Sequence, residues 1–221
     1  MGGSMRRIVV GISGATGAIY GIRLLQVLHD LPDVETHLII TPAGRATIQL
    51  ETDWPLAQVE ALASQVHRYG DIAAAPSSGS FRVDAMVVLP CSMRTLTGIA
   101  YSISDNLLAR AADVTLKEGR PLILAPRETP LHLGHLRALL QVAEMGAKVV
   151  PPMPAFYHRP RTLDDIIDQT VQRICDQLRL ELPKDLFKRW QGGVASLADK
   201  ALEHEAAGLA PIEALDDVPG D

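Results

Sequence analysis

Two hydroxyl side chains lie in a glycine-rich turn near the start of the chain. Ser13 and Thr16 follow the apolar run Ile8–Val10, and apolar side chains recur at helical spacing in Ala18–Leu28. A helix that begins at such a turn offers free N–H groups and the positive end of its dipole, which favour a phosphate group. The pattern therefore predicts phosphate binding. The alternative is tight strand-to-helix packing with no ligand.

The residues of this turn distinguish among the known phosphate-binding sites. A P-loop requires Gly-Lys-Ser/Thr, and the turn contains no lysine. A dinucleotide turn has a glycine where Ser13 stands, and an acidic residue ends its second strand where this chain has Thr41. A nucleophile elbow, Gly-x-Ser-x-Gly, would need glycine where Ala15 stands. The turn therefore favours a mononucleotide such as FMN over NAD, and it disfavours a serine hydrolase.

Cationic side chains in later segments indicate a second anion site. Arginine and tyrosine give directed donors to a phosphate group. The candidates for this phosphate clamp are Arg110, Lys117, Arg127, Tyr157 and Arg173. For each of the cations, an exposed surface charge is the alternative. Glu128, beside Arg127, and Glu51, at a predicted helix end, can form ion pairs or transfer protons.

Composition excludes several classes of partner. The formal net charge of −5 over 221 residues does not suggest general nucleic-acid binding. His132 and His135 have no third ligand nearby, so no metal site is expected. Cys91 and Cys175 stand far apart, which indicates a reducing compartment and a cytoplasmic location. No apolar run reaches the length of about 18 residues that a membrane span needs, so no membrane contact is expected.

Strand-like and helix-like segments alternate along the chain. Strands are predicted at 8–10, 35–41, 85–89, 122–125 and 148–150, and helices at 18–28, 42–51, 55–66, 106–118, 135–145 and 163–180. This alternation predicts an α/β fold, with a parallel sheet covered on both faces and ligands at the carboxyl ends of the strands. We expect one edge to collect Ser13, Thr16, Thr41, Ser92–Thr95, Arg127, Glu128 and Tyr157, with Lys117 and Arg173 facing it.

The expected organisation is a single domain at 5–193. Residues 1–4 precede a second methionine and read as an expression-tag remnant. Residues 194–221 are rich in alanine and acidic side chains and are expected to form a partly mobile tail.

Eight motifs in order resemble the UbiX-type flavin prenyltransferases. They are GISGATGAIYG, LETD, SSGSF, PCSMRTL, RAADVTLKEGRPL, PRETPLHLGHL, PPMPAFYHRP and LFKRWQG, and they extend over 5–193. The resemblance implies a flavodoxin-like Rossmann fold of three αβα layers, usually assembled as a dodecamer with FMN held between subunits. It implies transfer of the dimethylallyl group from dimethylallyl phosphate to N5 and C6 of reduced FMN, without a metal. The product, prenylated FMN, would serve UbiD-type decarboxylases.

The resemblance also assigns residues. It implies FMN binding by Gly14, Ala15, Thr16, Thr41, Ser92, Met93, Arg94, Thr95 and Arg127. It implies dimethylallyl phosphate binding by Tyr157, Arg173, Lys117 and Arg110, with Ser78 in a Ser-Gly-Ser loop. The expected catalytic residues are Glu51, Glu128, Ser13 and Trp190, of which the two acids would handle protons and the tryptophan would face the prenyl group. Thr16 and Thr41 stand where many members have serine, and both keep a hydroxyl.

Two other functions fit parts of the sequence. FMN-dependent cysteine decarboxylases share the fold pattern, but they carry a Pro-Ala-Ser-Ala-Asn-Thr motif and a Met-rich clamp that this chain lacks. A flavin carrier without turnover would not need the cluster of cations. The cations therefore favour the prenyltransferase.

Overall fold

The computed structural model describes residues 5–190. The chain divides into two compact units after Phe187. The structure describes residues 5–187 of the first unit and Lys188–Trp190 of the second. The expected tag remnant at 1–4 and the expected tail at 194–221 lie outside the described residues. Trp190 falls in the second unit, and its side chain is 63% exposed.

Six parallel strands form one sheet in the order β3-β2-β1-β4-β5-β6. The strands are β1 (Arg6–Ile12), β2 (Val34–Ile40), β3 (Gln65–His67), β4 (Ala85–Cys91), β5 (Leu122–Pro126) and β6 (Lys148–Val149). The helices are α1 (Ala18–His29), α2 (Pro42–Glu51), α3 (Leu56–Ala61), α4 (Met93–Ala100), α5 (Leu107–Lys117), α6 (Leu133–Glu144) and α7 (Leu163–Gln177), with a 3₁₀ turn, η1, at Ala75–Ser77. The predicted parallel α/β sheet is confirmed.

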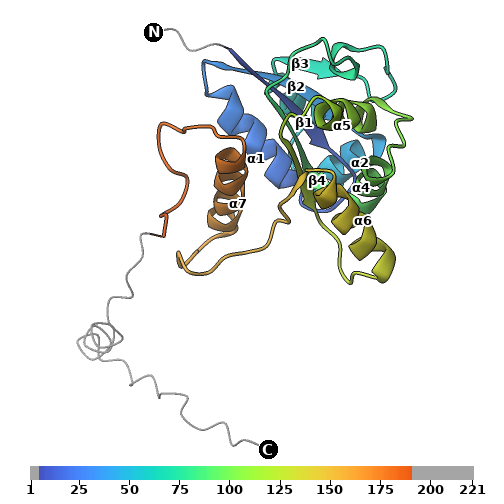
Figure 1. The fold of residues 1–221 in the computed structure, drawn as a ribbon. Coiled ribbons are helices and arrows are strands. Elements are labelled where there is room, and N and C mark those ends of the chain that lie inside the picture. The colour runs from blue at the N-terminus through green and yellow to red at the C-terminus, as the bar shows by residue number, and fades with distance from the viewer. Residues whose placement is uncertain (1–4, 191–221) are drawn as a thin grey trace, which may run out of the picture. The chain divides into compact units, whose positions relative to one another are not determined.

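Alternate residues of β1 face opposite cores, because successive strand side chains point to opposite faces of a sheet. Val10 belongs to the core that also contains Ile22 of α1 and Ile174 of α7. Val9 belongs to the second core, with Leu96 of α4 and Leu108 of α5. Figure 1 shows α1 and α7 on one side of the sheet and α4, α5 and α6 on the other. The sheet is therefore covered on both faces, as a parallel sheet requires.

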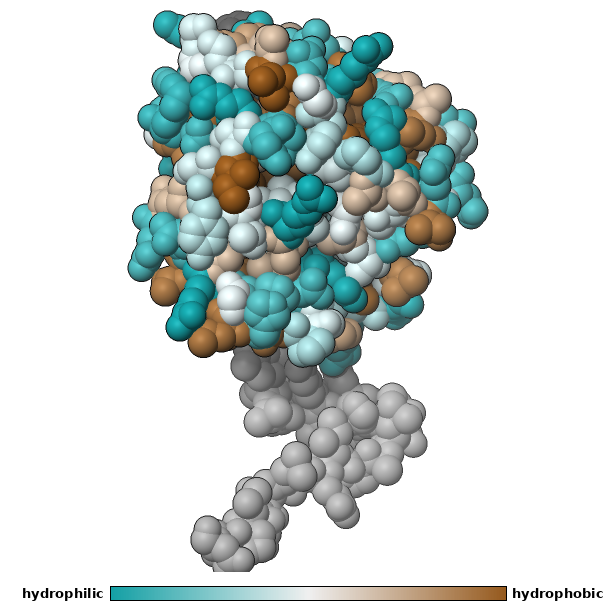
Figure 2. Space-filling view, turned by 90° about the vertical axis from the view of Figure 1, so that its right-hand side faces the viewer, coloured by the Kyte–Doolittle hydropathy of each residue, from teal (hydrophilic) through white to brown (hydrophobic). Residues whose placement is uncertain are grey.

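The face covered by α4, α5 and α6 is mixed in polarity. Figure 2 shows apolar side chains scattered among polar ones on this side of the molecule. Several of the exposed apolar residues belong to α6 and the segment just before it, namely Leu131, Leu133, Leu136 and Leu140. None of the helices within residues 5–190 combines the length and apolar composition needed to cross a membrane.

The predicted helix at 55–66 is wrong in its second half. Helix α3 ends at Ala61, and Gln65–His67 pair instead with β2 as the edge strand β3. Ser64 sets this register, because its hydroxyl accepts a hydrogen bond from the Thr36 backbone N–H at 3.0 Å and its own N–H donates to Thr36 Oγ1 at 2.9 Å. Such pairing between distant segments leaves little trace in the local apolar spacing.

A pair of buried histidines joins β2 to β3. His37 Nδ1 lies 2.9 Å from His67 Nε2, and His37 Nε2 lies 3.0 Å from Glu35 Oε1. Burial lowers the pKa of both imidazoles below the ordinary value of 6.5, although Glu35 acts against this shift at His37 and Asp71 at His67. The Arg7 guanidinium adds to the lowering at His37. The folded state therefore favours neutral imidazoles.

Stability should fall on mild acidification because of this pair. A histidine with a lowered folded pKa contributes its full stability above the unfolded pKa near 6.5 and loses it as the pH falls. The loss is at most about 1.4 kcal/mol per pH unit for each histidine. We expect urea unfolding to show less loss between pH 7.5 and 5.5 in His67→Gln than in the unsubstituted protein. The exposed His29→Gln should behave as the unsubstituted protein, and equal losses in all three would contradict this account.

Candidate active site

Four helix N-termini converge on one cavity at the carboxyl edge of the sheet. The cavity has a volume of about 920 Å³, and its lining includes Thr41, Ser92, Asn106 and His132. These residues are the N-caps of α2, α4, α5 and α6, and each side chain accepts a hydrogen bond from a backbone N–H in the first turn of its helix. Capped N-termini keep further N–H groups and the positive dipole ends directed at the space before them. The cavity is therefore suited to an anionic ligand.

The turn after β1 forms the floor beside α2. A Cβ at Gly14 would lie 2.3 Å from the Cβ of Ala43, so glycine lets the turn approach the start of α2. Thr41 Oγ1 accepts from the Gly44 N–H at 2.9 Å, which leaves its own O–H proton available to a ligand. The glycine-rich turn and the second-strand hydroxyl predicted from the sequence therefore meet at the cavity.

Ser13 connects the ends of β1 and β4. Its hydroxyl donates to the Pro90 carbonyl at 3.1 Å and accepts from the Ser92 N–H at 2.7 Å, and the residue is fully buried. This position fixes the start of α4. Cys91 lies directly before Ser92, and burial raises the pKa of its thiol, so it stays protonated.

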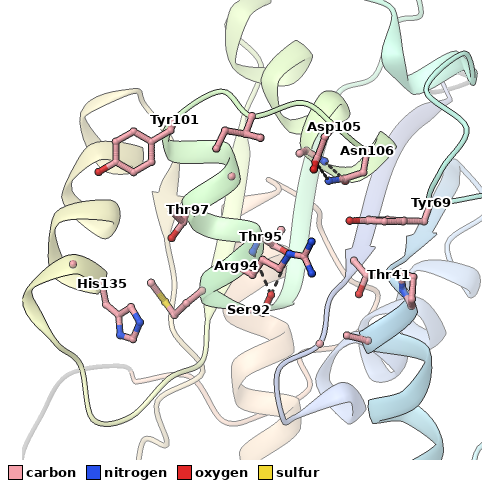
Figure 3. A pocket seen from close by; sticks show the side chains of 18 of the residues that line it. Thr41, Tyr69, Ser92, Arg94, Thr95, Thr97, Tyr101, Asp105, Asn106 and His135 are labelled. Atoms are coloured by element: carbon pink, nitrogen blue, oxygen red, sulfur yellow. Dashed lines mark hydrogen bonds between the residues drawn. The ribbon is translucent and has the colours of Figure 1, made fainter.

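Arg94 is the cation within the cavity lining. It lies in the first turn of α4, and Figure 3 shows it near the middle of the cavity, between Tyr69 on one side and His135 on the other. Arg127 follows the end of β5, and its backbone N–H donates to the Cys91 carbonyl at 3.2 Å. This bond places Arg127 beside the start of α4. Glu128 is exposed, and its carboxylate accepts from the Thr129 N–H at 3.1 Å.

Glu51 caps a helix other than its own. Its Oε2 accepts from the N–H groups of Gly17 at 2.8 Å and Ala18 at 3.2 Å, at the start of α1. Gly17 is the N-cap of α1 and has φ = 95°, a left-handed conformation that glycine adopts without strain. The carboxylate therefore lies beside the Gly14–Thr16 turn and complements the positive end of α1.

Ser78, Arg110 and Lys117 form a separate group. Arg110 Nε donates to the Ser77 carbonyl at 3.2 Å, and the side-chain ends of Lys117 and Glu118 lie against Gly79. Helix α5 begins at the cavity with Asn106 and ends at Lys117, eleven positions later. At 1.5 Å per residue these are about 16 Å apart. Lys117 precedes β5, so it lies at the starting edge of the strands, and the expectation that it faces their carboxyl edge is wrong.

Arg173 and Tyr157 also lie apart from the cavity lining. Arg173 is in the second half of α7, on the α1 face, and its guanidinium pairs with Asp176 at 3.0 Å. The end of α7 is held at the starting edge, because the Arg6 guanidinium donates to the Leu178 carbonyl at 2.8 Å. Tyr157 is half exposed, and its ring packs edge-on against those of His158 and Phe187. One protomer therefore does not bring the predicted phosphate clamp together.

Several lining residues were not singled out from the sequence as ligands. They are Tyr69, Thr97, Tyr101, Ile103, Asp105 and Asn106. Asn106 could have been found from its place before a helical pattern, since asparagine is a favoured N-cap. Tyr69 and Tyr101 lie in irregular segments, where no periodicity marks them.

The histidine pair before and within α6 lines the same cavity. The rings of His132 and His135 lie 3.6 Å apart, and no three metal-ligating side chains gather within the described residues. His132 Nδ1 accepts from the Gly134 N–H at 3.0 Å, so the neutral ring carries its proton on Nε2. The pair therefore forms a polar aromatic wall.

Comparisons with known proteins agree with this architecture. A family model described as Flavoprotein matches residues 3–175. The chain is 62% identical to flavin prenyltransferase UbiX of Escherichia coli strain K12. The alignment extends over 188 residues and covers 85% of this chain and 100% of that protein. The structure of a UbiX with FMN and dimethylallyl pyrophosphate is similar at 49% identity and a TM-score of 0.82, over 85% of this chain and 98% of the other.

A second solved structure is a dodecameric FMN-dependent UbiX-like decarboxylase from Escherichia coli O157:H7. It is similar at 51% identity and a TM-score of 0.81, over 85% of this chain and 100% of the other. Because family model, sequence and structure agree, the chain belongs to the flavoprotein family and, within it, to the UbiX-type flavin prenyltransferases.

Replacing Glu51 should test its contact with α1. Glu51→Ala removes the acceptor for two N–H groups and should lower the free energy of unfolding by about 0.5–2 kcal/mol, the usual cost of losing a helix cap. Glu51→Gln keeps an acceptor oxygen and should lose less. Urea unfolding would measure both, with the exposed Asp53→Ala as the matched control. Equal stability of Glu51→Ala and the control would contradict the capping role.

Proposed function

We propose that this flavin prenyltransferase joins the dimethylallyl group of dimethylallyl phosphate to N5 and C6 of reduced FMN. The observation that carries the proposal is the convergence of four capped helix N-termini and Arg94 on one cavity. The relative whose structure contains FMN and dimethylallyl pyrophosphate supports the same ligand classes for this chain. Reduced FMN supplies the nucleophilic ring atoms, and the protein supplies binding, orientation and charge.

FMN fits the groups that line the cavity. The proposed ligands are Gly14, Ala15, Thr16, Thr41, Ser92, Met93, Arg94, Thr95 and Arg127. The free hydroxyl proton of Thr41 and the N–H groups at the starts of α2 and α4 can donate to a phosphate or to ribityl hydroxyls. A nicotinamide dinucleotide would instead call for an acidic ribose ligand at the position of Thr41.

Departure of the phosphate requires stabilisation of its growing charge. Arg94 and Arg127 lie at the cavity edge of the sheet, and donors fixed in advance stabilise such charge best. The cavity lining of the same protomer does not include the remaining proposed ligands, which are Ser78, Arg110, Lys117, Tyr157 and Arg173. Since one relative is dodecameric, we propose that neighbouring subunits bring these groups to each cavity.

Two acids are proposed to handle protons. Glu128 lies on an exposed turn beside Arg127, where its carboxylate is open to a substrate from a neighbouring subunit. Glu51 stays hydrogen-bonded to α1, so its proposed part is to hold the turn that carries Thr16 and to exchange protons there. Ser13 has both its donor and acceptor engaged, which favours a positioning role. Trp190 is proposed to face the prenyl group.

The remaining proposals concern partners and location. A UbiD-type decarboxylase is the proposed recipient of the prenylated FMN, and a homododecamer is the proposed assembly. The proposed location is the cytoplasm, which agrees with two buried thiols, Cys91 and Cys175, that are not joined in a disulfide. The proposed domain extends over 5–193. A cysteine decarboxylase is disfavoured, because its Pro-Ala-Ser-Ala-Asn-Thr motif would have asparagine where Arg94 stands.

Mass spectrometry of the flavin tests the reaction. The protein should bind FMN in preference to FAD. After anaerobic incubation with reduced FMN and dimethylallyl phosphate, the extracted flavin should gain the mass of one dimethylallyl group. Dimethylallyl pyrophosphate, run in parallel, should react less, because no three metal-ligating side chains gather among the described residues to hold the magnesium that a diphosphate usually requires. In the Asp-rich stretch Asp164–Asp168, Asp165 caps α7 and Asp168 pairs with Arg23 at 2.7 Å. Unchanged FMN with both substrates would overturn the proposal.

Lys117→Ala should weaken the binding of dimethylallyl phosphate without affecting the binding of FMN. FMN binding should be unchanged, because Lys117 lies about 16 Å along α5 from the cavity. The KM for dimethylallyl phosphate should rise by about 10-fold to 100-fold, as expected for a hydrogen bond to a charged group worth about 1.5–3 kcal/mol. The exposed Lys184→Ala is the matched control. An unchanged KM would show that Lys117 is a surface charge.

A further inference from the structure

The loop from Ser77 to Phe81 is shaped by two arginines of α5 and its C-terminal turn. Arg120 Nη2 donates to the Gly79 carbonyl at 2.8 Å, and Arg120 Nη1 donates to the Phe81 carbonyl at 3.1 Å. At the other end of the loop, Arg110 Nε donates to the Ser77 carbonyl at 3.2 Å. Three acceptors of this short loop are therefore paired with guanidinium groups.

Arg120 itself is fixed in place. Its side chain is only 17% exposed. It follows Gly119, whose φ of 65° ends α5, and its backbone N–H donates to the Thr115 carbonyl at 2.9 Å. A planar guanidinium with two parallel donors suits two carbonyls on one loop, whereas a lysine ammonium offers no such fork. Arg120 is therefore suited to keep the Ser77–Phe81 loop in one conformation.

The outer side of the loop carries donors. Ser78 and Ser80 are exposed, and their hydroxyls lie 2.9 Å apart. A Cβ at Gly79 would lie 2.2 Å from Glu118 Oε1 and 2.9 Å from Lys117 Nζ, so the backbone touches the ends of these side chains. Lys117, and Arg120 more weakly, lower the pKa of Glu118, which agrees with a compact charged cluster.

Carbonyl oxygens repel a phosphate, and hydroxyls and an ammonium attract it. Because Arg120 occupies two carbonyls of the loop, the exposed polar groups beside it are the hydroxyls of Ser78 and Ser80 and the half-exposed Lys117, whose ammonium also pairs with Glu118. We infer that Arg120 is a positioning residue for the recognition of dimethylallyl phosphate, acting by holding the Ser77–Phe81 loop in its phosphate-binding shape. This inference rests on the proposed function, in which Ser78 and Lys117 reach the cavity of a neighbouring subunit.

The test compares Arg120→Met, Arg120→Lys and the control Arg82→Met, which replaces an exposed arginine directly after the loop. Both Arg120 variants should raise the KM for dimethylallyl phosphate by roughly 10-fold or more, with kcat and FMN affinity near those of the unsubstituted enzyme. Hydrogen exchange of the amides at 77–81 should be faster in both, and Arg82→Met should match the unsubstituted enzyme in every measurement.

Three results would overturn the inference. One is an unchanged KM in Arg120→Met. Another is a normal KM in Arg120→Lys, because charge alone would then suffice. The third is a parallel loss of kcat, FMN affinity and thermal stability, which would indicate a general structural role. If the unsubstituted enzyme transfers no prenyl group, the proposed function fails, and the exchange measurement still decides whether Arg120 holds the loop.

Discussion

Convergence of helix N-termini at the carboxyl edge of a parallel sheet is the constraint on which the rest of this structure depends. The strands β1, β2, β4 and β5 each lead to a helix at this edge, and Thr41 and Ser92 cap the helices that follow β2 and β4. Asn106 and His132 do the same for α5 and α6. The side-chain caps occupy some of the terminal N–H groups, and the remaining groups and the helix dipoles favour an anion. An uncharged ligand would not use this arrangement.

The two edges of the sheet carry different groups of polar side chains. The cavity edge carries the glycine-rich turn, the Ser92–Thr95 segment and Arg94. The starting edge carries Lys117, Arg120 and the loop that contains Ser78. Helix α5 joins the two edges and keeps them about 16 Å apart. The proposed reaction needs both groups, and this separation is the physical basis for proposing an active site shared between subunits.

Local signals in the sequence predicted most of this fold. These signals depend only on residues that are close in the sequence, so they can be recognised without the tertiary structure. They are the apolar runs of β1 and β4, the turn at Gly11–Gly17 and the proline at the start of α2. Strand β3 was missed because its three residues depend on pairing with β2 and on the contact between Ser64 and Thr36.

The placement of the cations was harder to predict. Spacing along the sequence put Arg110 and Lys117 on one helix, but the direction in which that helix leaves the cavity is a property of the whole sheet. Arg173 was placed near the same edge, whereas α7 packs on the opposite face with α1. Residue types therefore suggest which side chains could bind a phosphate, whereas the topology determines which of them one protomer brings to the cavity.

We propose that one active site combines the cavity of one subunit with Lys117 of another. Co-expression of Arg94→Ala and Lys117→Ala chains with different tags, followed by purification of oligomers that carry both tags, tests it most directly. If the claim is correct, these hybrids transfer the prenyl group faster than either variant alone when dimethylallyl phosphate is kept below the raised KM of Lys117→Ala, since some sites contain both an intact cavity and an intact Lys117. Hybrids no more active than the two separate variants would contradict the claim.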